Sequence, residues 1–262
     1  MLREETVFGP IFSRRLGSSL GINLLPEKGK ICNFDCIYCE CGWNRDGRGD
    51  TVLPTAEKVR TDLERMLKKL AAEKTPVDSI TFSGDGEPTL NLEFPQIIDD
   101  TLRLRDQYYP QAKVSVLSNA TRVHIPEVFD ALRRVDNPIM KIDAPTNELV
   151  AKINNPAPRY DVKRVIEALK RFEGAFVLQT CMLRTAPSQA GVSDFDSSLF
   201  VEEMMDIVRL LRPREWMVYT IDRPTPMQGL QKFSPQEMKT LVQPVIDEGV
   251  TRVQIKGAVE DC

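Results

Sequence analysis

Short apolar runs alternate with amphipathic stretches along most of the chain. The runs are rich in β-branched and aromatic residues, which is typical of strands that are buried in a sheet. We expect strands at 21–25, 80–82, 114–117, 139–142, 176–178, 216–219 and near 253–255.

The stretches between these runs repeat apolar residues at helical spacing. Thr55 precedes one such stripe, over 59–70, and is expected to be the N-cap of a helix there. Ser234 and Glu237 have the spacing of a capping box, with proline at the first helical position, and predict a helix through 238–245. Further helices are expected over 162–169 and 200–211.

Repeated strand–helix units predict an α/β fold with a parallel sheet and outer helices, because parallel strands need long crossover connections. A chain of 262 residues has an ordinary length for one α/β barrel. We expect a single domain over 1–262, in which 1–30 is a lead-in and first strand, 31–230 is the core and 231–262 is a C-terminal helix and strand. Functional residues of parallel α/β barrels gather at the C-terminal ends of the strands, so polar motifs that follow strands carry most weight.

The composition is that of a globular, mildly acidic protein. Hydrophobic residues make up 42% of the chain, and its formal net charge is −3. That charge weakens the case for a nucleic-acid partner, because phosphate binding depends on clustered Lys and Arg. His124 is the only histidine, so a Ser-His or Cys-His triad would have to use it. We find no signal peptide and no long apolar run, and therefore expect a cytoplasmic protein without a membrane span.

Three cysteines lie close together in the sequence, at Cys32, Cys36 and Cys39. Three thiolates cannot bind all the irons of a [4Fe–4S] cluster, so this spacing predicts one iron open to a non-protein ligand. A reducing cytosol disfavours a disulfide among them. A zinc site that adds Cys41 is the alternative, although structural zinc sites usually combine two separated pairs of ligands. Cys181 lies in an apolar run and is expected to be a small buried side chain.

The cysteine spacing, with Tyr38 directly before the last cysteine, resembles the signature of the radical S-adenosylmethionine (SAM) superfamily. The resemblance implies a [4Fe–4S] cluster on Cys32, Cys36 and Cys39, with SAM chelated at the open iron, and a partial (β/α)6 barrel. It also implies an electron donor such as flavodoxin or ferredoxin. Enzymes of this kind cleave SAM to methionine and a 5′-deoxyadenosyl radical, which removes a hydrogen atom from the substrate.

The run at 80–82 leads into a polar stretch that contains two glycines. Taken alone, this stretch is a turn before a helix, although glycine also permits the backbone to approach a ligand closely. It resembles the Gly-Gly-Glu motif of the superfamily with an aspartate inserted, which implies that it lies at the methionyl amino group of SAM. The residues of this stretch are Ser83, Gly84, Asp85, Gly86 and Glu87.

Polar residues also end three later strands of the expected barrel. They are Asn119, the pair Lys141 and Asp143, and Gln179. Asn and Asp are common in ordinary turns, whereas an amide on a buried strand, as at Gln179, needs a hydrogen-bond partner. By resemblance, Asn119 matches the Asn of a Thr-Asn-Gly stretch, and Asp143 matches a polar residue near the ribose of SAM. We expect all four residues at the cofactor.

Three further stretches, at 12–21, 153–156 and 219–224, resemble the radical SAM proteins related to wyosine synthase, a tRNA-modifying enzyme. This resemblance implies a tRNA base as the substrate. The chain departs from wyosine synthase in having no flavodoxin-like domain, no N-terminal cysteines for a second cluster and no strongly basic face.

Five polar residues near the expected mouth of the barrel are candidates for substrate contact. Arginines at such positions also form exposed ion pairs, which add about 0–1 kcal/mol to stability. The candidates are Arg14, Arg15, Tyr219, Asp222 and Arg223.

Two alternative functions fit the same cysteines: an activating enzyme that installs a glycyl radical on a partner protein, and a non-enzymatic zinc or redox protein. Colour separates iron from zinc. Anaerobically purified protein is expected to be brown with broad visible absorption, as iron–sulfur proteins are, whereas a zinc protein is colourless. A metal analysis that returns zinc and no iron would contradict the cluster.

Overall fold

The computed structural model describes residues 5–13, 16–47, 49–186 and 195–257. Two predicted substrate contacts, Arg14 and Arg15, lie outside the described residues. The chain divides into two compact units, each of which is described by itself. The first comprises Met1–Asn33 and Asn44–Ile139, and the second comprises Phe34–Trp43 and Met140–Cys262.

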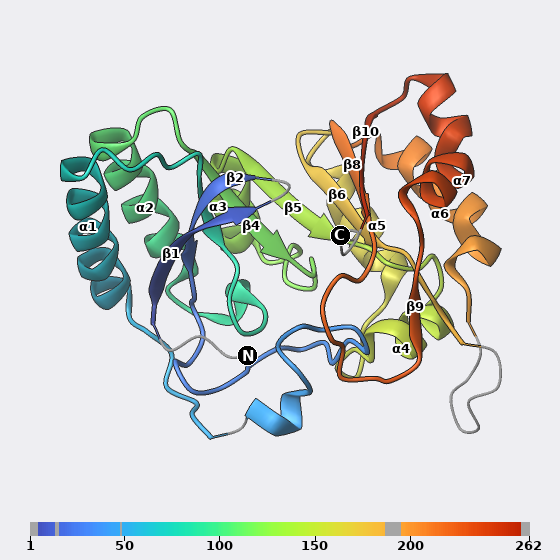
Figure 1. Cartoon of the computed structure of the whole chain (residues 1–262), viewed down its shortest axis with the longest axis horizontal. Helices are drawn as coiled ribbons and strands as arrows, with labels where there is room; N and C mark the ends of the chain where they lie inside the picture. Colours follow the sequence, from blue (N-terminus) through green and yellow to red (C-terminus); the bar gives the residue numbers. More distant parts are fainter. Residues whose placement is uncertain (1–4, 14–15, 48, 187–194, 258–262) are drawn as a thin grey trace, which may run out of the picture. The chain divides into compact units, whose positions relative to one another are not determined.

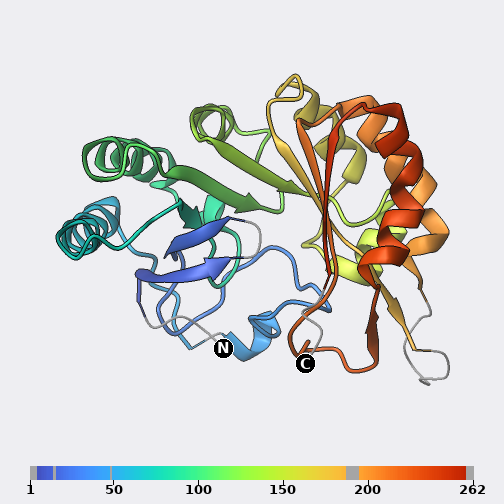
Figure 2. The ribbon, with the colours of Figure 1, turned by 45° about the horizontal axis from the view of Figure 1, so that its top comes forward.

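The first unit is built on strands β1 to β4, which lie side by side in chain order. β1 and β2 form an antiparallel hairpin, whereas β2, β3 and β4 are parallel. Helices α1 and α2 pack against each other on one side of these strands (Figures 1 and 2). The bounds are β1 Val7–Ser13, β2 Gly17–Ile22, α1 Ala56–Ala72, β3 Ser79–Phe82, α2 Phe94–Tyr108, β4 Lys113–Ser118 and α3 Pro126–Arg134, with short 3-10 turns at Asn44–Gly47 and Pro88–Leu90.

The hairpin β1–β2 departs from the predicted first strand. A strand was expected at 21–25, but β2 ends at Ile22 and is preceded by β1. Val7 is the only buried residue of β1, so this strand carries no apolar run that the sequence pattern could reveal. Edge strands are often polar in this way, because only part of their surface is covered.

The two faces of the parallel strands differ in polarity. Ile80 and Phe82 are fully buried, and the Phe82 ring meets the edge of Phe94 on α2 with 6.3 Å between ring centroids. The alternate positions of the same strand are Ser79 and Thr81. Because side chains alternate across a strand, these hydroxyls lie on the face away from α2.

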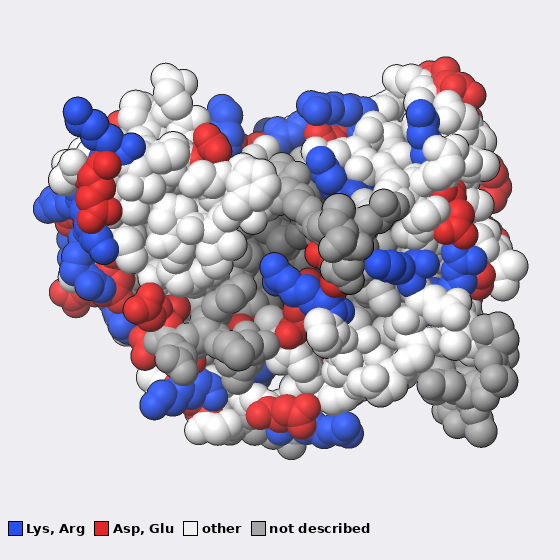
Figure 3. Space-filling view, in the orientation of Figure 1, with Lys and Arg blue, Asp and Glu red and all other residues white. Residues whose placement is uncertain are grey.

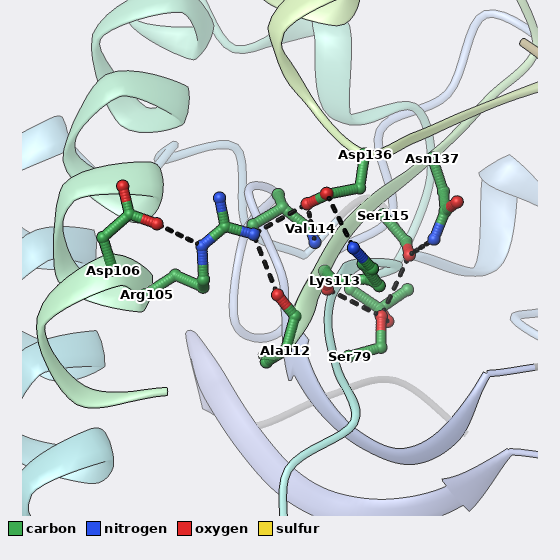
Figure 4. A network of polar contacts seen from close by, with 10 residues as sticks. Ser79, Arg105, Asp106, Ala112, Lys113, Val114, Ser115, Asp136 and Asn137 are labelled. Atoms are coloured by element: carbon green, nitrogen blue, oxygen red, sulfur yellow. Dashed lines mark hydrogen bonds and ion pairs between the residues drawn. The ribbon is translucent and has the colours of Figure 1, made fainter. Parts of the chain in front are cut away.

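The hydroxyls of this second face form a continuous ladder across the strands. Ser19 Oγ lies 2.7 Å from Thr81 Oγ1, which lies 3.0 Å from Ser79 Oγ. Ser79 Oγ is 2.9 Å from Ser115 Oγ, which accepts from Asn137 Nδ2 at 3.0 Å (Figure 4). Parallel sheets usually bury apolar side chains on both faces, and the ladder supplies the partners that its buried polar atoms require.

Asp136 joins the end of α2 to the starts of two strands. Its Oδ2 accepts from Arg105 Nη1 at 2.7 Å and from the main-chain N–H of Val114 at 2.9 Å (Figure 4). Arg105 also donates to the carbonyl of Ala112 at 2.8 Å. Burial alone would raise the pKa of Asp136, but the Val114 and Arg105 donors lower it below the ordinary value.

Strand β5, Asn137–Lys141, carries the chain from the first unit into the second. The second unit is built on the parallel neighbours β6, β8 and β10, and β7 with β9 forms a separate antiparallel ribbon. The bounds are α4 Asn147–Asn154, α5 Val162–Lys170, β6 Val177–Cys181, β7 Leu183–Thr185, α6 Val201–Leu211, β8 Glu215–Tyr219, β9 Leu230–Lys232, α7 Pro235–Glu248 and β10 Arg252–Lys256, with a 3-10 turn at Ser197–Phe200.

The predicted α/β class is confirmed, and so are all four predicted helices, as α1, α5, α6 and α7. The capping box is present: Ser234 Oγ accepts from the N–H of Glu237 at 3.1 Å, and Glu237 accepts from the N–H of Ser234 at 2.7 Å. Helices α2, α3 and α4 and the ribbon of β7 and β9 are additional. None of the described helices combines the length and apolar character needed to cross a membrane.

Replacing Asp136 by alanine is expected to lower the free energy of unfolding by about 1.5–3 kcal/mol, because hydrogen bonds to a charged group are lost. A carboxyl whose pKa falls on folding stabilises the protein above its unfolded pKa, about 3.9 for Asp. The deficit of the variant should therefore be full at neutral pH and shrink as the pH falls through the lower folded pKa. Urea unfolding at several pH values measures it.

The matched control is Asp106→Ala. Asp106 contacts the same Arg105 at 2.6 Å, but its side chain is 68% exposed. Such a pair contributes about 0–1 kcal/mol. Equal losses in the two variants would contradict the role given to Asp136.

Candidate functional site

Main-chain pairing attaches the start of the cysteine segment to the glycine-containing stretch, within the first unit. Ile31 donates its N–H to the Asp85 carbonyl at 3.1 Å and accepts from the N–H of Glu87 at 3.1 Å. Gly86 lies between them with φ +138°, and a Cβ there would lie 1.9 Å from the Ile31 oxygen. Gly86 is therefore required for the close approach of two backbone segments.

Residues that precede Gly86 are also held by the protein itself. A Cβ on Gly84 would lie 2.0 Å from Asn23 Oδ1, which also accepts from the Asp85 N–H at 3.2 Å. Ser83 donates its N–H to the Ile22 carbonyl at 3.2 Å. The sequence predicted this stretch at SAM; the described contacts fix its backbone, and the contact with SAM stays a prediction.

The carboxylate of Glu87 is buried and fully hydrogen-bonded. Its Oε1 accepts from Thr89 N at 3.2 Å, Thr89 Oγ1 at 2.6 Å and Ser118 Oγ at 2.8 Å, and its Oε2 accepts from Asn119 N at 2.7 Å. Burial raises the pKa of Glu87 although these donors oppose the shift. The side chain thus joins the loop after β3 to the end of β4.

Asn119, placed by Glu87, holds the cysteine segment in turn. Its Nδ2 donates to Asn33 Oδ1 at 2.6 Å and lies 3.9 Å from the sulfur of Cys32. Its Oδ1 accepts from the N–H of Thr121 at 3.1 Å, which fixes the orientation of the amide. The predicted Asn119 is therefore next to a predicted cluster cysteine.

Cys36 and Cys39 belong to the second unit, where a tight turn presents them. Cys39 donates its N–H to the Cys36 carbonyl at 3.1 Å, and Gly42 donates to the Cys39 carbonyl at 3.0 Å. Burial raises the pKa of the Cys36 thiol to about 12. Such a thiol is ionised when a metal ion binds it, because coordination displaces the proton.

A buried polar network lies beside this turn, around the ammonium group of Lys141. Its Nζ donates to Tyr38 Oη at 3.0 Å and to Tyr219 Oη at 2.8 Å, and it lies 5.2 and 5.3 Å from the centroids of the two rings. Tyr38 Oη donates to Asp143 Oδ2, and Asp143 Oδ1 accepts from the N–H of Cys181 at 2.9 Å. The predicted substrate residue Tyr219 thus contacts the predicted cofactor residue Lys141.

The charge on Lys141 is stabilised by this network. Burial by itself would lower the pKa of the amine, but the Asp143 carboxylate, 4.0 Å away, raises it above the ordinary value. Lys141 is therefore a fixed positive charge rather than a free nucleophile. Cys181 is fully buried, as the sequence predicted.

The other predicted residues of the second unit lie on β6 and after β8. Gln179 is buried on β6, and its main-chain carbonyl accepts from the N–H of Ile142 at 3.1 Å. Arg223 pairs with Glu40, the residue after Cys39, at 2.6 Å, and both are exposed. Asp222 and Arg223 help to line an open hollow of about 510 Å³, whose other lining residues are Arg184, Ile221, Leu230, Gln231, Lys232 and Glu237.

The cysteines of this segment have the donor atoms that a cluster with thiolate ligands requires. Cys32, Cys36, Cys39 and Cys41 all retain partial exposure, and thiolate sulfur is the ligand that iron–sulfur clusters use. Cys32 belongs to the first unit and the others to the second. Among the residues that the structure describes, no group of three His, Cys, Asp or Glu side chains is in position to hold a metal ion.

Sequence reasoning missed Asn154 and Asn23, both fully buried polar side chains. Asn154 lies in the stretch 153–156 that supported the family resemblance, but nothing in its local pattern assigned it to a site. The distribution of surface charge agrees with the sequence. On the face shown in Figure 3, Lys and Arg lie interspersed with Asp and Glu, as expected for a net charge of −3.

Glu87→Gln is expected to lower the free energy of unfolding by about 1–3 kcal/mol, because the new NH2 group meets donors where an acceptor is needed. Urea unfolding of the purified protein measures the loss. Glu57→Gln, on an exposed position of α1, is the control and should change stability by no more than about 0.5 kcal/mol. A Glu87 variant as stable as this control would show that the four contacts contribute nothing.

Comparison with solved structures identifies the fold. A radical SAM methyltransferase from Sphaerobacter thermophilus superimposes with a TM-score of 0.66 at 17% identity, covering 92% of this chain and 67% of that chain. SuiB from Streptococcus suis, bound to S-adenosylmethionine, gives 0.60 at 16% identity and covers 90% of this chain, which spans about half of SuiB (49%). These likenesses confirm the expected partial-barrel fold.

Comparison of sequences identifies the family. The UPF0026 protein of Helicobacter pylori (strain J99) is 29% identical over 237 residues, which cover 88% of this chain and 71% of that protein. The family model of the radical SAM superfamily matches residues 27–184, more than half of the chain. The match favours an enzyme over the alternative of a non-enzymatic zinc protein, and the link to wyosine synthase stays a prediction. The chain belongs to the radical SAM superfamily, whose enzymes use a [4Fe–4S] cluster and SAM.

Proposed function

We propose that this radical SAM enzyme holds its cluster through Cys32, Cys36 and Cys39 and binds SAM at the remaining iron. The observation that carries the proposal is the cysteine spacing with Tyr38, which lies inside the family match at 27–184. The turn that presents Cys36 and Cys39 as partly exposed thiols supports it. Cys41 is left out of the ligand set, because a fourth thiolate would close the site to SAM.

We assign contacts with SAM to two groups of residues, one in each unit. Bound cluster and SAM together supply reductive cleavage of SAM to methionine and a 5′-deoxyadenosyl radical, which removes a hydrogen atom from the substrate. The chain's own residues bind and orient SAM and the substrate, and they exclude water from the site. The first group is Ser83, Gly84, Asp85, Gly86, Glu87 and Asn119, and the second is Tyr38, Lys141, Asp143 and Gln179.

Two members of the second group, Lys141 and Asp143, are held in place by hydrogen bonds within the protein. Lys141 is held by two tyrosine hydroxyls, and Asp143 accepts from Tyr38 and from the main chain of Cys181. Such preorganised charges need little rearrangement to orient a ligand. Neither group has to transfer a proton, since cleavage of SAM is driven by an electron.

The substrate that we propose is a tRNA base, on the basis of the resemblance to the wyosine-synthase group. Tyr219, Asp222 and Arg223 are the contacts assigned to it within the described residues. Tyr219 touches Lys141, and Arg223 pairs with the neighbour of Cys39, so both lie beside proposed cofactor residues. The net charge of −3 predicts weak, salt-sensitive binding of RNA.

Radical SAM enzymes need an electron donor. For this chain we propose a small donor of the flavodoxin or ferredoxin type, in a reducing cytoplasm that keeps the thiols available for iron. A glycyl-radical protein as the substrate remains the alternative to tRNA.

The test is an anaerobic assay of the reconstituted, dithionite-reduced enzyme, with 5′-deoxyadenosine and methionine as the products measured. Cys36→Ala should bind less iron and lose at least about 100-fold in SAM cleavage, because a cluster ligand is removed. Cys41→Ala is the matched control and should keep both iron and cleavage. Adding total tRNA should increase 5′-deoxyadenosine, whereas a protein pool should not.

Unchanged cleavage in Cys36→Ala would contradict the cluster assignment. Equal loss of iron in Cys41→Ala would indicate a site with four thiolates. Stimulation by protein and not by tRNA would favour the activating-enzyme alternative.

A further inference from the structure

The stretch 153–156 has no contact role in the proposed function. It pairs with the main chain of the cysteine segment on both sides of Cys36. The two segments run antiparallel within the second unit and exchange main-chain contacts. Asp35 N donates to Asn154 O at 2.9 Å, Ile37 N donates to Ile153 O at 3.0 Å, and Phe34 forms an antiparallel bridge with Pro156. An irregular loop is fixed in this way because its backbone groups find partners outside it.

The end of α4 places Asn154 for this contact. Asn154 is the last residue of the helix, and Asn155 follows in the left-handed conformation with φ 39°, donating its N–H to the Val150 carbonyl. Asparagine tolerates this conformation at a helix C-terminus. The sharp ending leaves the Asn154 side chain 1% exposed, on the side of the cysteine turn.

The amide of Asn154 connects a proposed cluster ligand to the Lys141 network. Its Nδ2 donates to Asp143 Oδ2 at 2.6 Å and lies 3.4 Å from the sulfur of Cys36. It also lies 3.4 Å from Tyr38 Oη. An NH2 group has two hydrogens, so one can serve Asp143 while the other points to sulfur.

We propose that Asn154 is a positioning residue that sets the reduction potential of the cluster by donating an N–H···S hydrogen bond to Cys36. This rests on the proposed function, in which Cys36 is a cluster ligand. A hydrogen bond to a ligand sulfur stabilises the electron-rich reduced cluster and raises the potential. The short contact with Asp143 keeps the amide from rotating away.

Asn119 is the counterpart in the first unit, with a weaker contact. Its Nδ2 is 3.9 Å from Cys32 and makes its short hydrogen bond, 2.6 Å, to Asn33 instead. N–H···S attraction falls with distance, so Asn119 should influence the potential less than Asn154.

The experiment is an EPR-monitored redox titration of the reconstituted protein without SAM. Asn154→Leu, which removes the donor at similar volume, should move the midpoint to a more negative value. At a fixed applied potential the ratio of reduced to oxidised cluster should fall by about tenfold, which is about 59 mV for one electron. Asn119→Leu should give a smaller fall in the same direction.

One variant serves as the control. Asn155→Gly alters the same segment at a position whose φ glycine accepts. It should leave the midpoint potential unchanged.

The outcomes separate this inference from the proposed function. Wild-type protein that binds no iron would overturn the proposed function itself. An intact cluster with an unchanged potential in Asn154→Leu, or an equal shift in Asn155→Gly, would overturn the inference alone. If Asn154→Leu loses its iron, Asn154→Ser replaces it, because serine is too short to reach the sulfur; its potential should fall likewise, and an unchanged value would overturn the inference.

Discussion

The conformation of the irregular cysteine segment depends on main-chain hydrogen bonds to partners outside the segment. Ile31 is paired with the stretch around Gly86, and residues 35–37 are paired with 153–155. Because buried backbone groups must find partners, each pairing restricts the sequence of the partner segment. Gly86 must lack a Cβ, and α4 must end where it does. The positions of the thiols thus follow from segments far from them in the chain.

The same contact fixes the ends of parallel strands in both units: a buried carboxylate accepts a main-chain N–H. Glu87, after β3, accepts from the N–H of Asn119 after β4, and Asp143, after β5, accepts from the N–H of Cys181 at the end of β6. In each case a buried carboxylate after one strand fixes the end of the next. A carboxylate in such a place is stabilised by N–H and O–H donors, so two side chains that we propose as contacts of SAM also have a structural role.

Elements that could be predicted are those whose signal is local. Apolar runs marked the parallel strands, and Ser234 with Glu237 marked the start of α7, because capping is decided within one turn. Strand β1 was missed because only Val7 is buried in it. Polar residues after strands could be selected by their position. Their contacts could not, because the partners are distant in the sequence. Glu87 accepts from Asn119, 32 positions away, and Asn154 contacts Cys36, 118 positions away.

The hydroxyl ladder of the first unit has a direction as well as a sequence of contacts. Asn137 donates to Ser115 through its Nδ2, so the Ser115 proton is free to turn to Ser79. Ser79 Oγ in turn donates to the carbonyl of Lys113 at 3.1 Å, so the direction that starts at the terminal amide passes through two hydroxyls and ends on the main chain. A carboxylate at 137 would accept instead, and the Ser115 proton would then turn toward it and away from Ser79.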